Sequence, residues 1–270
     1  MNTPESYPSK LRSLEEELRS LGKLVVAVSG GVDSAVLLHA AFNTLGRENA
    51  LGFIADSPSL LRRDLEEARG LTQSIGARLV EVQTKELENE GYLENVGTRC
   101  YFCRRELFDS MLVWARANGF PNLAYGEITD DFSDDRPGRR AAKELRVVAP
   151  LAKAGFGKEE VRHYAREVGL EVAEKPASAC LSSRIPRGTR VTRERLKRIE
   201  AAEERVQALG FRVLRVRDHG ATARLELGSG ELERGQELCS QLEKAVQAAG
   251  FEMLELTSYI PPTERSGVSS

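Results

Sequence analysis

The sequence predicts an α/β protein in which a doubly wound parallel sheet is followed by a smaller C-terminal α+β domain. Short apolar runs rich in valine alternate with segments of helical periodicity through roughly the first 150 residues, and such alternation indicates βαβ units. A glycine turn, SGGVDS, directly follows the first of these runs. After about residue 170 the alternation gives way to a stretch rich in Pro, Ser, Gly and Arg, which indicates a change of domain.

The first part of the chain contains the elements of the parallel sheet. Residues 9–21 have the apolar spacing of an amphipathic helix, and the β-branched run KLVVAV (23–28) is typical of a buried strand. The helix that follows spans 34–46 and has Gly46 as its C-cap. Further along we expect, in order, strand 50–56, helix 60–76, strand 78–83, a helix near 100–118, and strands 122–127 and 145–149.

The second part predicts a separate small unit. Residues 174–192 have no periodicity and form a long loop in this interpretation. After it we expect, in order, helix 192–209, a hairpin made of segments 211–220 and 221–228, helix 229–249 and strand 251–256. The expected domains are therefore a first domain over 1–170, a linker over 171–191, a small α+β domain over 192–260 and a flexible tail over 261–270.

The composition is that of a soluble globular protein. Of 270 residues, 41% are hydrophobic and 30% are charged, and no apolar run reaches the roughly 18–20 residues of a membrane span. The N-terminus lacks the apolar core of a signal peptide, so we expect a cytoplasmic protein with no membrane partner. A net charge of −2 argues against a nucleic-acid partner. Four cysteines in such a protein point to a metal or to catalysis, and not to disulfides.

The turn at 29–34 is the first candidate site. Glycine allows the backbone to approach a bound group closely. The N–H groups of Gly30, Gly31, Val32 and Asp33 can point together at one anion, helped by the dipole of the following helix. The Lys-Ser/Thr pair of the Walker phosphate loop is missing, and so is the G-x-G-x-x-G spacing of dinucleotide-binding proteins. The turn therefore predicts an anion site of another type.

The stretch S-G-G-V-D-S resembles the PP-loop of ATP pyrophosphatases, which split ATP between its α and β phosphates. The resemblance implies a fold of the adenine nucleotide alpha hydrolase type. It also implies an ATP-binding loop of six residues, namely Ser29, Gly30, Gly31, Val32, Asp33 and Ser34. The missing lysine is explained, because such a loop holds the departing pyrophosphate. In this family the end of the second strand lies beside the adenine, so Asp56 and Ser57 are candidate nucleotide contacts, with an ordinary turn as the alternative.

Three of the four cysteines lie in polar surroundings. Cys100 and Cys103 stand at the start of an expected helix, where the helix dipole lowers the pKa of a thiol, and Cys180 lies in the long loop. A redox pair or half of a zinc site would also fit C-x-x-C, but the three histidines of the chain are isolated from one another. Three cysteines can hold a [4Fe–4S] cluster and leave one iron open for sulfide. Cys239 is expected in the core.

Five stretches together make the chain similar to the LarE family of ATP-dependent sulfur transferases, over about residues 15–258. They are SGGVDS, RCYFC (99–103), DDRPGRRAAKE (134–144), PLAK (150–153) and ACLSSRIPRGTRVT (179–192). The resemblance implies a pyridinium dicarboxylate mononucleotide as substrate, and as product the bisthiocarboxylate ligand of a nickel-pincer cofactor. One form of the family gives up the sulfur of a single loop cysteine, and another has three cysteines, for which a cluster is implied. We expect the cluster form, with Cys100, Cys103 and Cys180 as catalytic cluster ligands; sacrifice of Cys180 alone stays open.

The long loop over 174–192, which carries Cys180 and is called the cysteine loop below, contains candidate anion ligands. Further candidates are arginines on the strand expected at 211–220. By the resemblance, three of these candidates bind the substrate phosphate or a neighbouring anion: Arg184, Arg215 and Arg217. The last two alternate along one strand and so share a face, and guanidinium groups suit phosphate and carboxylate. Glu200 and Glu226 are candidates for metal or orienting carboxylates. A lattice of surface salt bridges is the alternative for both groups.

Mg²⁺ is expected to accompany the ATP. Asp130 and Asp131 offer carboxylates for it, with a solvated acidic loop as the alternative. Before this pair the chain departs from the Gly-Thr-Asn pattern common in PP-loop enzymes, because Glu127 and Ile128 stand there. Glu127 and Ile128 therefore replace polar groups that help to position the nucleotide in those enzymes, and nucleotide contacts at these two positions stay open.

The implied function is adenylation followed by sulfur transfer. A substrate carboxylate attacks the α-phosphorus of ATP, pyrophosphate leaves, and sulfur from the cluster or from Cys180 then displaces AMP. The expected partners are a small-molecule nucleotide substrate, a sulfide donor and further copies of the same chain. Three alternatives stay open: an iron–sulfur PP-loop tRNA thiolase, an amide-forming PP-loop synthetase, and a non-catalytic nucleotide-binding module with a structural metal.

Overall fold

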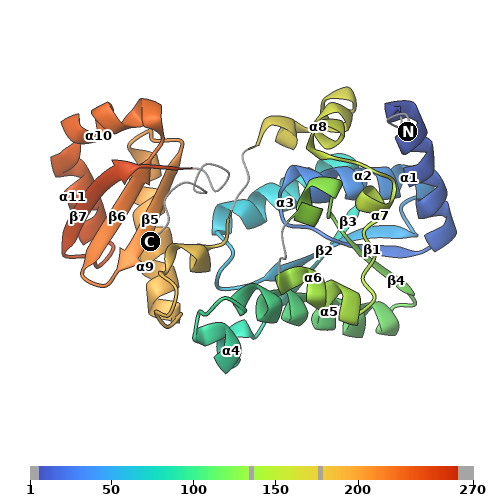
Figure 1. Ribbon diagram of the computed structural model, residues 1–270, viewed down its shortest axis with the longest axis horizontal. Helices are drawn as coiled ribbons and strands as arrows, with labels where there is room; N and C mark the ends of the chain where they lie inside the picture. The colour runs from blue at the N-terminus through green and yellow to red at the C-terminus, as the bar shows by residue number, and fades with distance from the viewer. Residues whose placement is uncertain (1–5, 134–136, 176–178, 261–270) are drawn as a thin grey trace. The chain divides into compact units, whose positions relative to one another are not determined.

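The chain divides into two compact units in the computed structural model, which describes residues 6–133, 137–175 and 179–260 (Figure 1). One unit is formed by Met1–Tyr92 and Gly97–Ser178, and the other by Leu93–Val96 and Ala179–Ser270. The tail expected over 261–270 lies outside the described residues. In the described part of the chain, no helix is both long and apolar enough to cross a bilayer.

A four-stranded parallel sheet forms the centre of the first unit. Its strands are β1 (Leu24–Ala27), β2 (Ala50–Asp56), β3 (Arg78–Gln83) and β4 (Asn122–Tyr125). Their order is β3-β2-β1-β4, and β1 pairs in parallel with both β2 and β4 along its whole length. The expected parallel sheet is therefore confirmed. The turn at 29–34 follows the carboxyl end of its central strand, which is where ligands of such sheets bind.

Helices cover both faces of this sheet (Figure 1). The helices of the unit are α1 (Tyr7–Leu21), α2 (Val32–Leu45), α3 (Arg62–Ile75), α4 (Glu90–Leu93), α5 (Arg99–Ala117), α6 (Pro137–Glu144), α7 (Pro150–Lys153) and α8 (Lys158–Glu167). Apolar residues of α1, α2, α3 and α8 share one core cluster with β1 and β2. Residues of α5 and α6 pack in the cluster on the opposite face. The doubly wound arrangement predicted from the alternation is thus confirmed.

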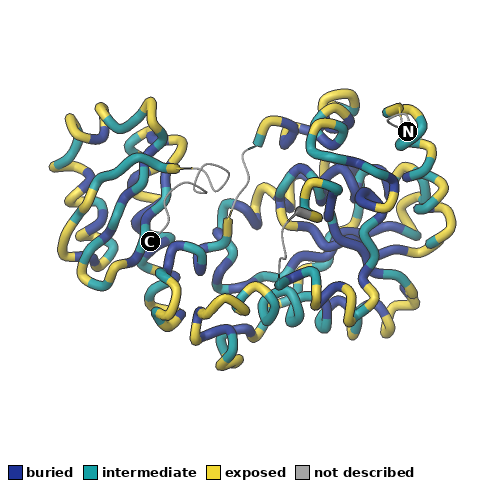
Figure 2. The backbone as a smooth tube through the Cα atoms, in the orientation of Figure 1, coloured by how far each residue is buried: buried dark blue, intermediate teal, exposed yellow. Residues whose placement is uncertain are grey.

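The central strands are buried on both faces, which is why the sequence shows them as continuous apolar runs. In β1, Leu24 and Val26 belong to one core cluster, while Val25 and Ala27 belong to the other. Figure 2 shows this strand as buried backbone. Burial of a valine or leucine side chain contributes about 1.5–3 kcal/mol. Packing on both faces therefore holds the turn after β1 in a fixed place.

The second unit contains a three-stranded sheet of β5 (Leu214–His219), β6 (Thr222–Leu227) and β7 (Met253–Ser258). β5 and β6 form the predicted antiparallel hairpin, and β7 pairs with β6 in parallel. Buried and partly exposed residues alternate along β5 and β6, so one face is packed and the other is open. The helices α9 (Arg193–Ala208), α10 (Leu232–Glu237) and α11 (Cys239–Gln247) complete the smaller α+β region that the sequence predicts.

The strand expected over 145–149 is wrong. The segment makes a single bridge, between Val148 and Ala124 of β4. Arg146 has a left-handed backbone (φ 55°), and Pro150 begins the short helix α7. Because a left-handed residue and a proline stand on either side, the chain cannot stay extended for longer.

Several helices also differ from expectation. The helix expected over 229–249 is divided at Leu238 into α10 and α11. Four helices are absent from the expected elements, namely α4, α6, α7 and α8. The sequence does contain a signal for α8. Gly157 is its N-cap, and the carboxylate of Glu160, three residues later, accepts a hydrogen bond from the Gly157 N–H (2.9 Å).

Gly126 follows β4, where the backbone after the sheet comes close to the start of α2. A Cβ at this position would lie 2.7 Å from the Ser34 nitrogen and 2.8 Å from the Asp33 carbonyl carbon. We expect Gly126→Ala to lower the free energy of unfolding by about 1–3 kcal/mol, the usual cost of overpacking, as measured by urea denaturation. Gly70→Ala is the matched control, because nothing lies within 4 Å of its Cβ position. An equal loss in both variants would contradict this expectation.

Candidate functional site

The turn between β1 and α2 has the geometry of an anion-binding loop. Gly30 has a left-handed backbone (φ 71°), which glycine adopts without strain, and Gly31 is the N-cap of α2. Among the described residues, no side chain caps this helix start. The Ser34 hydroxyl donates to the Gly31 carbonyl (3.0 Å) and accepts from the Ser29 N–H (3.2 Å). The first turn of α2 therefore keeps backbone N–H donors for an anion.

Lys158, the first residue of α8, brings a positive charge to this loop. Its ammonium group lies 2.9 and 3.0 Å from the two carboxylate oxygens of Asp33, and its backbone N–H donates to the Asp130 carboxylate (2.6 Å). Lys158 is absent from the sequence-based candidates, although the stretch GKEEVR has the signal of a helix start. The loop thus has a lysine beside it, supplied by α8 and not by its own sequence.

The two aspartates expected to bind Mg²⁺ lie in the short 3-10 helix η2 (Thr129–Ser133). Asp130 accepts the hydrogen bond from Lys158, and Asp131 accepts one from the Ile128 N–H (3.3 Å). Asp130 is exposed and Asp131 partly exposed, so neither carboxylate is shut off from solvent. Both side chains hold the local backbone, and their role with Mg²⁺ stays a prediction.

Glu127 and Ile128, which replace the common PP-loop residues, are both buried. Glu127 forms an ion pair with Arg139 on α6 (2.8 Å). Burial, together with a hydrogen bond to Glu127, raises the pKa of the Tyr125 phenol above its usual range. The Glu127 carboxylate therefore fastens α6 to the end of β4.

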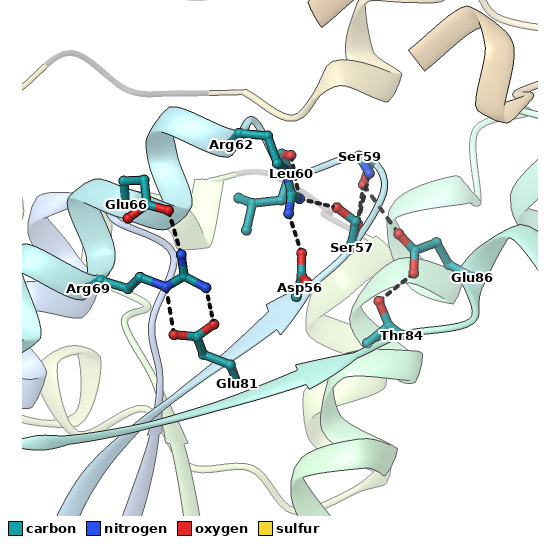
Figure 3. Close-up of polar contacts among 10 residues, drawn as sticks. All are labelled: Asp56, Ser57, Ser59, Leu60, Arg62, Glu66, Arg69, Glu81, Thr84 and Glu86. Carbon is teal, nitrogen blue, oxygen red and sulfur yellow. Dashed lines mark hydrogen bonds and ion pairs between the residues drawn. The ribbon is translucent and has the colours of Figure 1, made fainter. Parts of the chain in front are cut away.

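The end of β2 is a polar turn held by its own side chains (Figure 3). Arg62 pairs with Asp56 and donates to the carbonyl oxygens of Ser57 (2.8 Å) and Leu60 (2.9 Å). The Ser57 hydroxyl lies 2.8 Å from that of Ser59. Asp56 and Ser57 thus shape this turn, and their contact with a nucleotide stays a prediction.

A buried carboxylate supports the same turn from the side of β3 (Figure 3). Glu86 is 2% exposed and accepts hydrogen bonds from the hydroxyl groups of Thr84 (2.6 Å) and Ser59 (3.5 Å). These donors replace water that the carboxylate loses on burial. The network joins the carboxyl ends of β2 and β3. Sequence patterns do not report it, because a lone glutamate after a strand is an ordinary surface feature.

The candidate cysteines lie in both units. Cys100 and Cys103 stand in the first turns of α5, where Cys100 is exposed and Cys103 is partly exposed. Their spacing puts both on one side of the helix. Cys180 precedes the 3-10 helix η4 (Leu181–Arg184) in the second unit and is partly exposed. Cys239 begins α11 and is also partly exposed, so the expectation of a core cysteine is wrong.

Arg184 has a role other than the expected one. Its side chain is fully buried and makes two hydrogen bonds to the carboxylate of Glu203 on α9, at 2.9 and 3.1 Å. It also donates to the carbonyl oxygens of Ala179 and Cys180, and Glu203 accepts from the Val216 N–H (3.0 Å). The guanidinium is thus used inside the protein, where it fixes the loop that carries Cys180, and it is not presented to a phosphate. Sequence reasoning named Arg184 but missed Glu203.

Arg217 lies on the open face of the C-terminal sheet. Its guanidinium pairs with Glu226 through two hydrogen bonds (3.0 and 2.9 Å) and donates a third to the Ser183 carbonyl (2.7 Å). Arg215 is on the same strand, two residues earlier, and donates to the Leu214 carbonyl (2.7 Å). Arg217 therefore ties the cysteine loop to β5, and anion binding by the two arginines stays a prediction.

The candidate metal ligands are two glutamates and three cysteines. In the described part of the chain, no three His, Cys, Asp or Glu side chains form a group that could hold a metal ion. Glu226 is engaged by Arg217, and Glu200 lies on α9. Metal binding by these glutamates or by the three cysteines stays a prediction.

The side chain of Asn95 holds the second half of the cysteine loop, at residues 185–189. It is buried and has a left-handed backbone (φ 54°), which asparagine tolerates better than most residues. Its side-chain amide donates to the carbonyl oxygens of Ile185 (3.2 Å), Pro186 (2.8 Å) and Thr189 (3.1 Å). These bonds explain why Leu93–Val96 belongs to the second unit.

Comparison with known protein families gives a match in the first part of the chain. The family model described as NAD synthase matches residues 9–96, a segment that runs from α1 through β3 and includes the turn at 29–34. The NH(3)-dependent NAD(+) synthetase of Methanocaldococcus jannaschii is 26% identical over 63% of this chain and 68% of its own. The family match therefore covers the part of the first unit that carries the loop and ends with Leu93–Val96 of the second unit.

Two relatives cover most of the chain. An uncharacterized protein of Synechocystis sp. is 41% identical over 226 residues, which is 84% of each chain. The pyridinium-3,5-bisthiocarboxylic acid mononucleotide synthase of Lactiplantibacillus plantarum is 31% identical over 248 residues, 92% of this chain and 90% of its own. Unlike the family model, these two matches are too long to be confined to either unit.

The buried pair of Arg184 and Glu203 gives a stability prediction. Arg184→Met leaves the Glu203 carboxylate buried without its partner, and we expect a loss of about 3–5 kcal/mol in the free energy of unfolding, measured in urea. Adding Glu203→Leu removes the stranded charge and should recover most of that loss. The control is Arg224→Met, which breaks the exposed pair with Glu255 and should cost less than about 1 kcal/mol. Equal losses in the two single variants would rule out a special role for the buried pair.

Proposed function

The chain belongs to the LarE family, the family of the Lactiplantibacillus plantarum synthase, and we propose that it is an ATP-dependent sulfur transferase. In this proposal it activates a carboxylate of a pyridinium dicarboxylate mononucleotide and converts that carboxylate to a thiocarboxylate. AMP and pyrophosphate are the other products. The thiocarboxylates become the ligand atoms of a nickel-pincer cofactor.

The observation that carries the proposal is the turn at 29–34 with Lys158 beside it. The N–H groups at the start of α2 bind the phosphates that will leave as pyrophosphate, and the helix dipole favours their negative charge. Lys158, 2.9 Å from Asp33, is close enough to the loop to neutralise part of the same charge. Mg²⁺ accompanies the ATP, with Asp130 and Asp131 as candidate carboxylates for it.

The first chemical step makes the carboxylate reactive. A carboxylate oxygen attacks the α-phosphorus, and the bond from that phosphorus to the bridging oxygen of the β-phosphate breaks. Pyrophosphate leaves with the electron pair, and an acyl adenylate forms. Fixed N–H donors and a lysine at the leaving group stabilise the charge that develops there, which is the main way in which an enzyme accelerates such a step.

The second step replaces oxygen by sulfur. A sulfur nucleophile attacks the acyl carbon, the bond from that carbon to the AMP oxygen breaks, and AMP leaves with the electron pair. When the nucleophile is sulfide, the product is a thiocarboxylate. When it is the Cys180 thiolate, a thioester forms first, and loss of the Cα proton with cleavage of the Cβ–S bond then releases the thiocarboxylate and leaves dehydroalanine. Arg184 donates to the Cys180 carbonyl and Asn95 to the Pro186 carbonyl, and these contacts within the second unit support Cys180 as a residue of the transfer. Two carboxylates require two rounds.

Cys100, Cys103 and Cys180 are the residues that would hold a [4Fe–4S] cluster. Three thiolates are the donor set of such a cluster with one iron left open, and two of the three stand near the start of one helix. When bound, the cluster would supply sulfide to the acyl adenylate, and an external sulfide donor would replace it. Arg215 and Arg217 are the residues proposed to bind the phosphate of the substrate.

An amide-forming synthetase is the second candidate function. The match of the NAD synthase model to residues 9–96 favours it, because such enzymes also use ATP. That match covers the loop but ends before Cys100, Cys103 and Cys180, for which amide formation has no use. Sulfur transfer accounts for both parts of the chain.

Exchange of labelled pyrophosphate into ATP tests the adenylation step. We expect exchange only when the pyridinium dicarboxylate mononucleotide is present, and we expect Lys158→Met to lower its rate at least about tenfold. The control is Lys153→Met, which breaks a surface pair with Glu17 and should leave the rate unchanged. Unaltered exchange in Lys158→Met would remove this lysine from the mechanism, and exchange that depends on tRNA or on another carboxylic acid would favour an alternative function.

Anaerobic purification with iron and sulfide analysis tests the cluster. We expect about four irons per chain, with loss of iron and of the broad visible absorption in Cys103→Ala and in Cys180→Ala. Cys239→Ala is the control and should keep its iron. A protein that stays free of iron after reconstitution would contradict the cluster. Loss of one H₂S from Cys180 after a single turnover, seen by mass spectrometry, would show instead that this cysteine gives up its own sulfur.

A further inference from the structure

Lys175 is a largely buried lysine that contacts the phosphate loop, and the mechanism above does not use it. Its side chain is 19% exposed. The ammonium group lies 3.0 Å from the Gly30 carbonyl oxygen and 3.4 Å from an Asp64 carboxylate oxygen, and it also pairs with Glu67. An ammonium group has three N–H donors, so these three acceptors match its full capacity.

The contact with Gly30 fixes the direction of a peptide group. In a trans peptide the carbonyl oxygen and the next N–H point in opposite directions. Because the Gly30 carbonyl points at Lys175, the N–H of Gly31 points away from Lys175. Both residues of this peptide are glycines, and Gly30 already has φ 71°, so the residues themselves offer little resistance to a flip of the plane.

The Lys175 ammonium group also offsets the negative charges of Asp64 and Glu67 on α3, beside the loop. Asp64 is 4% exposed, and its backbone carbonyl lies 3.2 Å from the Cβ position of Gly30. Glu67 lies one turn further along α3. Without a cation between them and the loop, two carboxylates would face the place where a triphosphate is proposed to bind. Lys175 therefore acts on the loop both by a directed hydrogen bond and by its charge.

We propose that Lys175 is a positioning residue for ATP: it holds the Gly30–Gly31 peptide so that the Gly31 N–H faces the bound phosphates. This inference rests on the proposed function, because it assumes that the loop binds ATP. Lys175 itself need not contact the nucleotide. Its effect is on ATP affinity and not on the chemical step, because the peptide orientation matters as soon as the phosphates bind.

Titration calorimetry of the whole protein with ATP and Mg²⁺ tests the proposal. We expect Lys175→Met to raise the Kd of ATP about tenfold or more, and to raise the KM of ATP in the exchange assay while kcat changes less than about twofold. Lys175→Arg should restore most of the affinity, since a guanidinium can donate to the same carbonyl. The control is Arg69→Met on the same helix as Asp64, which breaks pairs with Glu66 and Glu81 (Figure 3) and should bind ATP like the wild type.

A triple variant separates the hydrogen bond from the charge. Lys175→Met combined with Asp64→Asn and Glu67→Gln removes both carboxylates and leaves no stranded buried charge, so it also guards against misfolding of the single variant. Weak ATP binding by the folded triple variant supports the positioning role. If Lys175→Met binds ATP with wild-type affinity, the proposal is overturned. If the triple variant does so, Lys175 acts only by offsetting the charges of Asp64 and Glu67, and the proposal is overturned as well. A wild-type protein that binds no ATP would instead contradict the proposed function itself.

Discussion

The start of α2, fixed at the carboxyl edge of a buried sheet, is the constraint on which the rest of the first unit depends. Its N–H groups can serve a ligand only if nothing caps them and if the turn before them does not move. Burial of β1 on both faces supplies the rigidity. Gly126 allows the chain after β4 to approach the backbone of Ser34, and Lys158 and Lys175 reach the turn from later parts of the chain.

In the second unit, buried polar side chains hold a loop in one conformation, as packing of the sheet holds the start of α2 in the first unit. Among the described residues around Cys180, the regular structure is one short 3-10 helix, so side chains hold this segment. Arg184, paired with Glu203, holds the backbone at Ala179 and Cys180, and Asn95 holds it at Pro186. A buried ion pair costs desolvation and adds little net stability, so its value here lies in fixing one conformation of the cysteine loop.

The sequence was sufficient for the four strands of the parallel sheet, because each is a short run rich in apolar residues. It was insufficient where contacts are distant. Lys158 and Asp33 are 125 residues apart, and Lys175 and Gly30 are 145 apart, and no local pattern reports such a meeting. Arg184 shows a second reason why sequence alone was insufficient. Its residue type suggested an anion ligand, but the structure shows that its side chain has no exposed surface.

The central claim is that a substrate carboxylate is adenylated, and oxygen labelling tests it most directly. The measurement is mass spectrometry of AMP formed from ATP and a pyridinium dicarboxylate mononucleotide labelled with ¹⁸O in its carboxylates. Attack of a carboxylate on the α-phosphorus predicts one ¹⁸O in each AMP, because the labelled oxygen leaves with AMP when sulfur takes its place. Unlabelled AMP would mean that another nucleophile attacks ATP, and it would contradict the account.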